Sequence, residues 1–267
     1  MSEPYIAIVG LGSIGSAHVN RLWEMGYRDL IGIESSPRPH EERFPVINAF
    51  EDLGTRQPTH ALICTPPELH YRHAKYFVDR GIDTFIEKPM TVKSVEASNL
   101  CAAAHMNKSI LAVGYMERAH PVVKEAMNFV KAHGYDRAEI CCYWRAGGKT
   151  YPLDTAKESS HAIDLAFYLL GPGHISNWSF DDGCEMTVQT LHEDGVACII
   201  RMNMYEWPRR VINLHSRDRA AFSEMYGESR DEWDACYREE LQAFLDRKPL
   251  CTGEDGLRVM KILEALQ

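Results

Sequence analysis

Residues 5–16 read YIAIVGLGSIGS, an apolar run followed by glycines at positions 10, 12 and 15. The spacing predicts a buried strand, a turn too tight for side chains, and a helix that begins at once. Gly10 would make the turn, Gly12 would let backbone amides approach a pyrophosphate, and Gly15 would bring the helix close to the strand. The stretch predicts a dinucleotide-binding loop, which also places Ser13 and Ile14 near the anionic centre of the ligand.

The next segment bears on which dinucleotide would bind. A second apolar run at 30–33 ends in Glu34, 19 positions after Gly15. An acidic residue about 20 positions on accepts hydrogen bonds from the ribose hydroxyls of NAD and repels a 2′-phosphate, so Glu34 favours NAD. NADP stays open, because hydroxyls and a guanidinium could hold the phosphate if Glu34 turned aside. The residues concerned are Ser35, Ser36 and Arg38, although Arg38 also fits a solvated loop charge.

Composition limits the class of protein. The chain has 267 residues, 45% of them hydrophobic and 25% charged, which suits one large globular domain or two modest ones. Its formal net charge of −9 gives no electrostatic case for binding nucleic acid or an anionic membrane. With no signal segment and no apolar stretch near 18 residues, a cytoplasmic protein is expected. The eight cysteines form no CxxC pair, so buried thiols are expected and no metal site is.

The order of expected elements predicts an α/β protein of two domains. Strands and helices alternate up to about residue 118, which is typical of a doubly wound parallel sheet. A helix at 120–133 follows, and the texture then changes to extended segments joined by turns, which predict an antiparallel sheet with one helix at 158–170. We therefore expect a dinucleotide-binding domain at 1–118 and an α+β substrate-binding and oligomerisation domain at 119–267. The C-terminal helices at 230–246 and 254–266 could pack back on the first domain.

Two short motifs follow strands of the first sheet. Thr65-Pro66-Pro67 follows the strand at 60–64, and Glu87-Lys88-Pro89 follows the strand at 83–86. Doubly wound folds bind ligands at these carboxyl ends, so both motifs should border the cofactor cleft. A lysine there can donate a hydrogen bond to a substrate oxygen. The alternative is that Glu87 and Lys88 merely pair with neighbours or solvent.

The order of these motifs resembles the glucose-fructose oxidoreductase and inositol dehydrogenase family across essentially the whole chain. The motif EKP after its strand is the most specific element of the resemblance. The motifs are GLGSIG at 10–15, TPPELH at 65–70, EKP at 87–89, VGYMERAHP at 113–121 and SHAIDLAFYLLG at 160–171.

The resemblance implies roles for individual residues. Lys88 would polarise the substrate oxygen, with His161 as the acid/base. Thr65 and Pro66 would flank the nicotinamide, His70 would fix the following loop, and Glu87 would border the cofactor. Many members carry an aspartate four residues before this histidine, but here Lys157 stands at that position. Glu158 would then have to replace the aspartate, or the chemistry has changed.

Further residues are candidates for binding the substrate. Tyr115 and Arg118 resemble positions that lie near the substrate in members acting on nucleotide-linked sugars. Arg145 follows the first strand of the second sheet and could clamp a carboxylate or phosphate. Lys157 and Asp164 flank His161, and Asp164 is more often a structural partner than a base.

The resulting expectation is an NAD(P)-dependent oxidoreductase that interconverts a secondary alcohol and a ketone on a sugar, nucleotide sugar, cyclitol or sugar-derived acid. One alternative is a reductase similar to the biliverdin reductases, and another is a sensor or scaffold that binds NAD(P) without turnover. The family resemblance also implies a homodimer or homotetramer formed through the C-terminal sheet.

Overall fold

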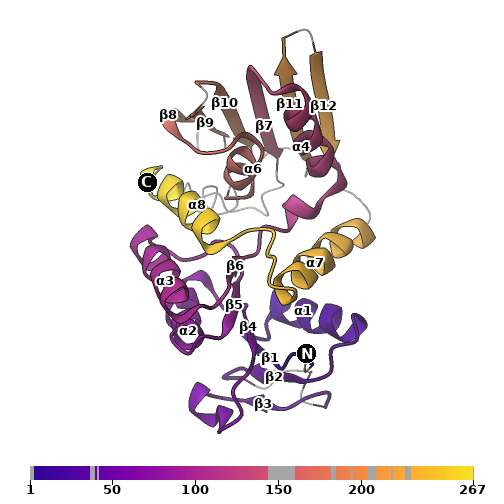
Figure 1. Cartoon of the computed structure of the whole chain (residues 1–267), viewed down its shortest axis with the longest axis vertical. Coiled ribbons are helices and arrows are strands. Elements are labelled where there is room, and N and C mark those ends of the chain that lie inside the picture. The colour runs from indigo at the N-terminus through magenta and orange to yellow at the C-terminus, as the bar shows by residue number, and fades with distance from the viewer. Residues whose placement is uncertain are drawn as a thin grey trace. The chain divides into compact units, whose positions relative to one another are not determined.

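The computed structural model describes residues 3–36, 40, 42–143, 160–181, 185–193, 195–203, 209–217, 219–225 and 230–266. The chain divides into two compact units (Figure 1). The first unit contains Met1–Tyr115 and Tyr237–Met260, and the second contains Met116–Cys236 and Lys261–Gln267. The chain thus leaves the first unit after Tyr115 and returns to it at Tyr237.

The first unit is built on a parallel six-stranded sheet in the order β3-β2-β1-β4-β5-β6. Its central strands are short, continuous apolar runs, as strands with both faces covered should be. The expected doubly wound sheet is confirmed, with one strand, β3, that has only two residues and therefore no periodic signal. The strands are β1 (Ile6–Val9), β2 (Leu30–Ile33), β3 (Val46–Ile47), β4 (His60–Ile63), β5 (Asp83–Ile86) and β6 (Leu111–Val113).

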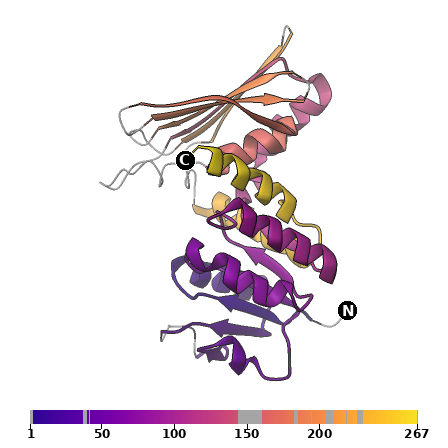
Figure 2. The same ribbon diagram turned by 90° about the vertical axis from the view of Figure 1, so that its left-hand side faces the viewer.

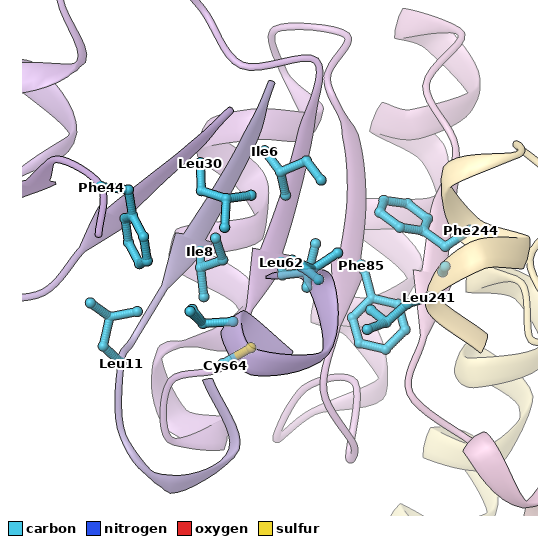
Figure 3. Close-up of a cluster of buried hydrophobic side chains, with 13 residues drawn as sticks. Ile6, Ile8, Leu11, Leu30, Phe44, Leu62, Cys64, Phe85, Leu241 and Phe244 are labelled. Atoms are coloured by element: carbon cyan, nitrogen blue, oxygen red, sulfur yellow. The ribbon is translucent and has the colours of Figure 1, made fainter. Parts of the chain in front are cut away.

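Helices cover both faces of this sheet. Figure 1 shows α1 (Ser13–Glu24) on one side and α2 (Pro67–Val78) and α3 (Ser94–Asn107) on the other. The core beneath α1 also contains Leu241 and Phe244 from α7 (Arg230–Leu245), which pack with strand residues such as Phe85 (Figure 3). The C-terminal part of the chain therefore completes the core of the first unit.

The second unit contains a six-stranded sheet in the order β12-β11-β7-β10-β9-β8. The expected antiparallel arrangement is confirmed for every pair except β7 with β10, which are parallel. These two strands are joined by a long connection rather than a hairpin, so no tight turn forces them to be antiparallel. The strands are β7 (Arg137–Tyr143), β8 (Gly173–Asp181), β9 (Glu185–His192), β10 (Ala197–Asn203), β11 (Arg209–Ser216) and β12 (Arg219–Met225).

Two helices lie on one face of this second sheet, α4 (Pro121–His133) and α6 (Ser160–Leu170) (Figure 2). Alternate strand residues such as Ile140, Val188 and Ile200 are fully buried beneath them. The period of two in β9 and β10 made those strands predictable, whereas β12 reads RAAFSEM and lacks a clear alternation.

Glycine contacts in the first unit yield a stability prediction. A Cβ added to Gly15 would lie 1.9 Å from the carbonyl oxygen of Gly10, whereas a Cβ added to Gly12 would meet nothing within 4 Å. Gly15→Ala should therefore lower the free energy of unfolding by about 1–3 kcal/mol, the range for overpacking. Gly12→Ala is the control and should change it by less than about 0.5 kcal/mol. Urea unfolding of the ligand-free protein measures both; equal midpoints would contradict the assigned close approach.

Candidate active site

The glycine loop after β1 leaves its backbone accessible at one point. Gly10 has φ +88°, a conformation that favours glycine, and an added Cβ would meet Thr65 at 2.9 Å. Gly12 is exposed and caps the N-terminus of α1, with open space where its side chain would be. Ser13 and Ile14 form the start of the helix. This combination suits a pyrophosphate at the helix N-terminus.

Glu34 is held against this loop by backbone donors. The N–H of Leu11 donates to Glu34 Oε2 at 2.9 Å, and the N–H of Ser36 donates to Oε1 at 3.2 Å. The Ser35 hydroxyl lies 3.4 Å from the same Oε1. The carboxylate is therefore fixed at the end of β2. The NADP alternative requires Glu34 to turn aside, and in this structure it does not. Arg38, the other part of that alternative, lies outside the described residues.

A cavity of about 540 Å³ lies at the carboxyl ends of β1, β2 and β4. Its size and its mixture of backbone, acidic and apolar surface fit part of a dinucleotide. Several residues expected at the cofactor line it, namely Gly10, Gly12, Glu34, Ser35, Thr65 and Pro66.

The same cavity includes residues that the sequence analysis missed. Phe50, Arg72 and His73 line it, and the rings of Phe50 and His73 meet edge to face at 5.2 Å. Burial and the neighbouring Arg72 lower the pKa of His73, which favours a neutral ring beside the cavity. A usable signal existed: residues 69, 72 and 73 share one face of a helix that begins directly after Thr65-Pro66.

The EKP motif sits at the end of β5 with its acidic residue buried. His18 Nε2 lies 2.6 Å from Glu87 Oε1, and the backbone N–H of Lys88 donates to Glu87 Oε2 at 3.2 Å. Burial acts to raise the pKa of Glu87, but the hydrogen bonds from His18 and Lys88 and the charges of both residues outweigh it and lower the pKa. Glu87 is therefore an ionised carboxylate inside the first unit, and His18 is a partner that the sequence analysis did not identify.

His70 connects the two strand-end motifs. Its Nδ1 lies 2.9 Å from the carbonyl oxygen of Pro89, and its Nε2 lies 2.7 Å from the carbonyl oxygen of Thr65. Burial lowers the pKa of His70, while the two carbonyl groups favour the protonated ring and oppose this shift. The imidazole thus holds the loop after β4 against the loop after β5.

The second unit brings Arg118, Asp164 and His161 near one another. Arg118 donates from Nε and Nη2 to the two carboxylate oxygens of Asp164, at 2.9 and 2.6 Å. Its guanidinium also lies 4.6 Å from the ring centre of Tyr168. His161 Nδ1 is 3.8 Å from Glu117 Oε1, and Glu117 is 1% exposed. Asp164 is therefore the structural partner of Arg118, and Glu117 is a further acidic residue that the sequence analysis missed.

Two of the remaining candidates, Lys88 and Tyr115, lie in the first unit. Lys88 belongs to the first unit and His161 to the second, so their convergence on one substrate stays a prediction. Tyr115 is fully buried at the end of the first unit. Arg145, Lys157 and Glu158 lie outside the described residues.

Comparison with known proteins adds to this geometry. Residues 5–115 match the model of a family described as an oxidoreductase family with an NAD-binding Rossmann fold, which includes the glucose-fructose oxidoreductase and inositol dehydrogenase enzymes. The first part of the chain is thus similar to the NAD-binding domain of this oxidoreductase family. The match covers the glycine loop, the TPP motif and EKP, and it confirms the resemblance drawn from the sequence.

Curated relatives extend beyond this segment. UDP-N-acetylglucosamine 3-dehydrogenase of Acidithiobacillus ferrooxidans is 25% identical over 234 residues, which cover 80% of this chain and 72% of that protein. The scyllo-inositol 2-dehydrogenase (NADP(+)) of Bacillus subtilis is 26% identical over 190 residues, 62% of this chain and 51% of that protein. The chain thus aligns with only about half the length of the second of these relatives.

A solved structure shares the whole fold. A probable dehydrogenase from Thermotoga maritima superposes with a TM-score of 0.84 at 16% identity, over 97% of this chain and 94% of that one. This likeness supports the two-sheet architecture of the chain and says nothing about its substrate.

The ion pair of the second unit yields another stability prediction. Arg118 and Asp164 are 5% and 1% exposed, so Asp164→Ala removes both hydrogen bonds of a buried bidentate ion pair. Asp164→Ala should lower the free energy of unfolding by about 3–5 kcal/mol, and adding Arg118→Met should restore part of the loss. Asp79→Ala is the control, because the Lys75–Asp79 pair is exposed and is worth under about 0.5 kcal/mol. Chemical denaturation measures the free energy of unfolding of each variant. Similar losses in Asp164→Ala and Asp79→Ala would contradict a large contribution of the buried pair to stability.

Proposed function

We propose that the protein is an NAD-dependent dehydrogenase that interconverts a secondary alcohol and a ketone on a sugar, nucleotide sugar, cyclitol or sugar-derived acid. The observation that carries the proposal is the assembly at the carboxyl ends of the first sheet. There His70 holds the loop of Thr65 to the loop of Pro89, and Glu87 holds the backbone of Lys88. The match of residues 5–115 to the oxidoreductase family model and the names of the two curated relatives support this reaction class.

Residues of the first unit would hold the cofactor. Bound NAD supplies the group that accepts or gives up the hydride. Gly12 and the N-terminus of α1 would bind the pyrophosphate, Glu34 would accept hydrogen bonds from ribose hydroxyls, and Thr65 and Pro66 would border the nicotinamide. The open space at Gly12 and the cavity beside Glu34 fit this assignment.

Lys88 would then bind the substrate oxygen, and His161 would transfer the hydroxyl proton. The Lys88 ammonium would donate a hydrogen bond to the substrate oxygen and stabilise the negative charge that develops there. His161 would accept the hydroxyl proton on oxidation and return it on reduction. Glu117 lies on the Nδ1 side of His161 and would stabilise the protonated ring.

Two rival functions predict different results from one experiment. Neither a sensor nor a scaffold would exchange hydride with any alcohol, and a reductase similar to the biliverdin reductases would act on tetrapyrroles instead. The test incubates the protein with NAD and a panel of nucleotide sugars, inositols and sugar acids, and separately with NADH and tetrapyrroles, and follows NADH by absorbance; turnover of the tetrapyrroles alone would favour the reductase. Turnover of a panel member supports the proposal; NAD binding with no turnover across the panel would favour the sensor.

A cytoplasmic homodimer or homotetramer is part of the same proposal. None of the helices in the described part of the chain combines the length and apolar character needed to cross a bilayer. The sheet face opposite α4 and α6 carries half-buried Leu191 and Ile199 beside an ion pair in which Arg201 lowers the pKa of Glu139. Such a mixed face supports assembly through this sheet.

The fixed carboxylate of Glu34 predicts the cofactor preference. The wild-type protein should bind NAD at least about tenfold more tightly than NADP, because a carboxylate repels a 2′-phosphate. Glu34→Ala should lose most of this preference by weakening NAD and relieving the repulsion of NADP. Glu51→Ala makes the same change of charge at an exposed position and should keep it. Fluorescence titration with NADH and NADPH measures both; an unchanged ratio in Glu34→Ala would remove Glu34 from cofactor selection.

The proposed role of Lys88 predicts a loss of turnover without a loss of cofactor binding. Lys88→Ala should reduce kcat at least about a hundredfold, within the range for lost acid–base and electrostatic help. Its Kd for NAD should stay within about threefold of the wild type, because the cofactor contacts named above are elsewhere. Lys93→Ala changes an exposed lysine of the same loop and should be near wild type in both. Wild-type turnover by Lys88→Ala would exclude Lys88 from the mechanism.

A further inference from the structure

The Glu87 carboxylate receives two donors inside the first unit. The side chain is 11% exposed; His18 Nε2 lies 2.6 Å from Oε1, and the Lys88 N–H donates to Oε2 at 3.2 Å. A Cβ added to Gly114 would lie 3.2 Å from Oε2, so the chain passes close to the carboxylate on that side as well. The carboxylate is thus fixed between α1, the EKP loop and the residue after β6.

His18 has no other polar contact in the described structure. Its side chain is fully buried, and its Nδ1 has no hydrogen-bond partner there. The ring meets Phe85 and Tyr237 edge to face, at centroid distances of 5.9 and 5.7 Å. Burying a polar imidazole in such apolar surroundings costs free energy, and among the described residues the contact with Glu87 is the polar interaction that offsets this cost.

In the short contact with His18, the Glu87 carboxylate is the acceptor. Burial acts to raise the pKa of Glu87, but the His18 bond and the Lys88 N–H and ammonium lower it overall, so the acceptor is an ionised carboxylate. The charge of Glu87 also affects two other titratable groups. Burial raises the pKa of the Cys64 thiol, and the Glu87 charge raises it further. Burial lowers the pKa of His70, and the same charge partly offsets that shift. Glu87 is therefore a fixed negative charge that contacts the backbone of Lys88.

We propose that His18 is a positioning residue for Lys88, because its Nε2 holds the Glu87 carboxylate in place. That carboxylate in turn holds the Lys88 backbone N–H and so orients the Lys88 side chain to donate to the substrate oxygen. This inference rests on the proposed function only for the use of the ammonium; the coupling itself is a property of the free protein.

Three variants distinguish the effect of the His18 hydrogen-bond donor from the effect of its aromatic ring. His18→Phe keeps the aromatic contacts and removes the donor, His18→Gln can place an amide N–H near the position of Nε2, and Glu87→Gln removes the charge at the same size. Each NAD-free protein is treated briefly with acetic anhydride at pH 8, and peptide mass spectrometry gives the ratio of acetylation at Lys88 to that at Lys93. Lys93 is exposed in the same loop and is the internal reference.

The expected result follows from the lost contact with the Lys88 backbone. His18→Phe and Glu87→Gln should raise the acetylation ratio about three- to tenfold, because the loop that carries Lys88 opens more often when Glu87 no longer holds it and the reagent then reaches the amine. His18→Gln should stay within about twofold of the wild type. Hydrogen exchange at the Lys88 amide should follow the same order, and kcat should fall in His18→Phe with little change in KM for NAD.

A folded His18→Phe with the wild-type acetylation ratio overturns the inference. Should His18→Phe fail to fold, ¹⁵N-histidine spectra of the wild type decide, since an unprotonated Nε2 at neutral pH overturns it and a protonated Nε2 supports it. The proposed function fails differently. Normal turnover by Lys88→Ala would remove the lysine from catalysis, yet it would leave the dependence of Lys88 reactivity on His18 standing.

Discussion

The close approach of α1 to the end of β1 is the constraint on which the candidate site depends. Gly15 sits so near the Gly10 carbonyl that no larger residue fits without movement. The same helix face continues through His18, Val19 and Leu22, all buried. A helix seated at this depth brings His18 to Glu87 at the end of β5. One glycine contact therefore sets both the helix N-terminus for the cofactor and the polar partner of the EKP motif.

Each unit also buries a carboxylate in contact with a nitrogen-containing side chain, and the two contacts have different consequences. Arg118 binds both oxygens of Asp164, which leaves that carboxylate little capacity to accept a proton from a substrate. His18 contacts only one oxygen of Glu87, and the second oxygen accepts the Lys88 N–H. The first pair fastens a helix to a turn within its own unit. The second directs a charge toward a residue at the carboxyl end of a parallel sheet, where such folds bind ligands.

How much of this was predictable depends on how local each signal is. The glycine loop, Glu34 and the EKP motif are read from short spacings, because backbone conformation and strand ends fix where such residues lie. His18 and Glu87 are 69 positions apart, and nothing in either segment signals that they meet. Glu117 is hidden for the same reason, since its contact with His161 depends on how a short turn packs beside α6. Strand β3 was missed because two residues carry no period.

The second unit limits which acid can assist His161. Asp164 lies one turn after His161 on the same helix, but the guanidinium of Arg118 binds both of its oxygens. Glu117 precedes Arg118 in the chain, so the turn that delivers the arginine to Asp164 also delivers a carboxylate to within 3.8 Å of His161 Nδ1. At 1% exposure that carboxylate is shielded from water, which strengthens its interaction with a protonated imidazole. The Arg118–Asp164 pair thus has a positional effect beyond its own energy, because among the described residues it leaves Glu117 as the acid beside His161.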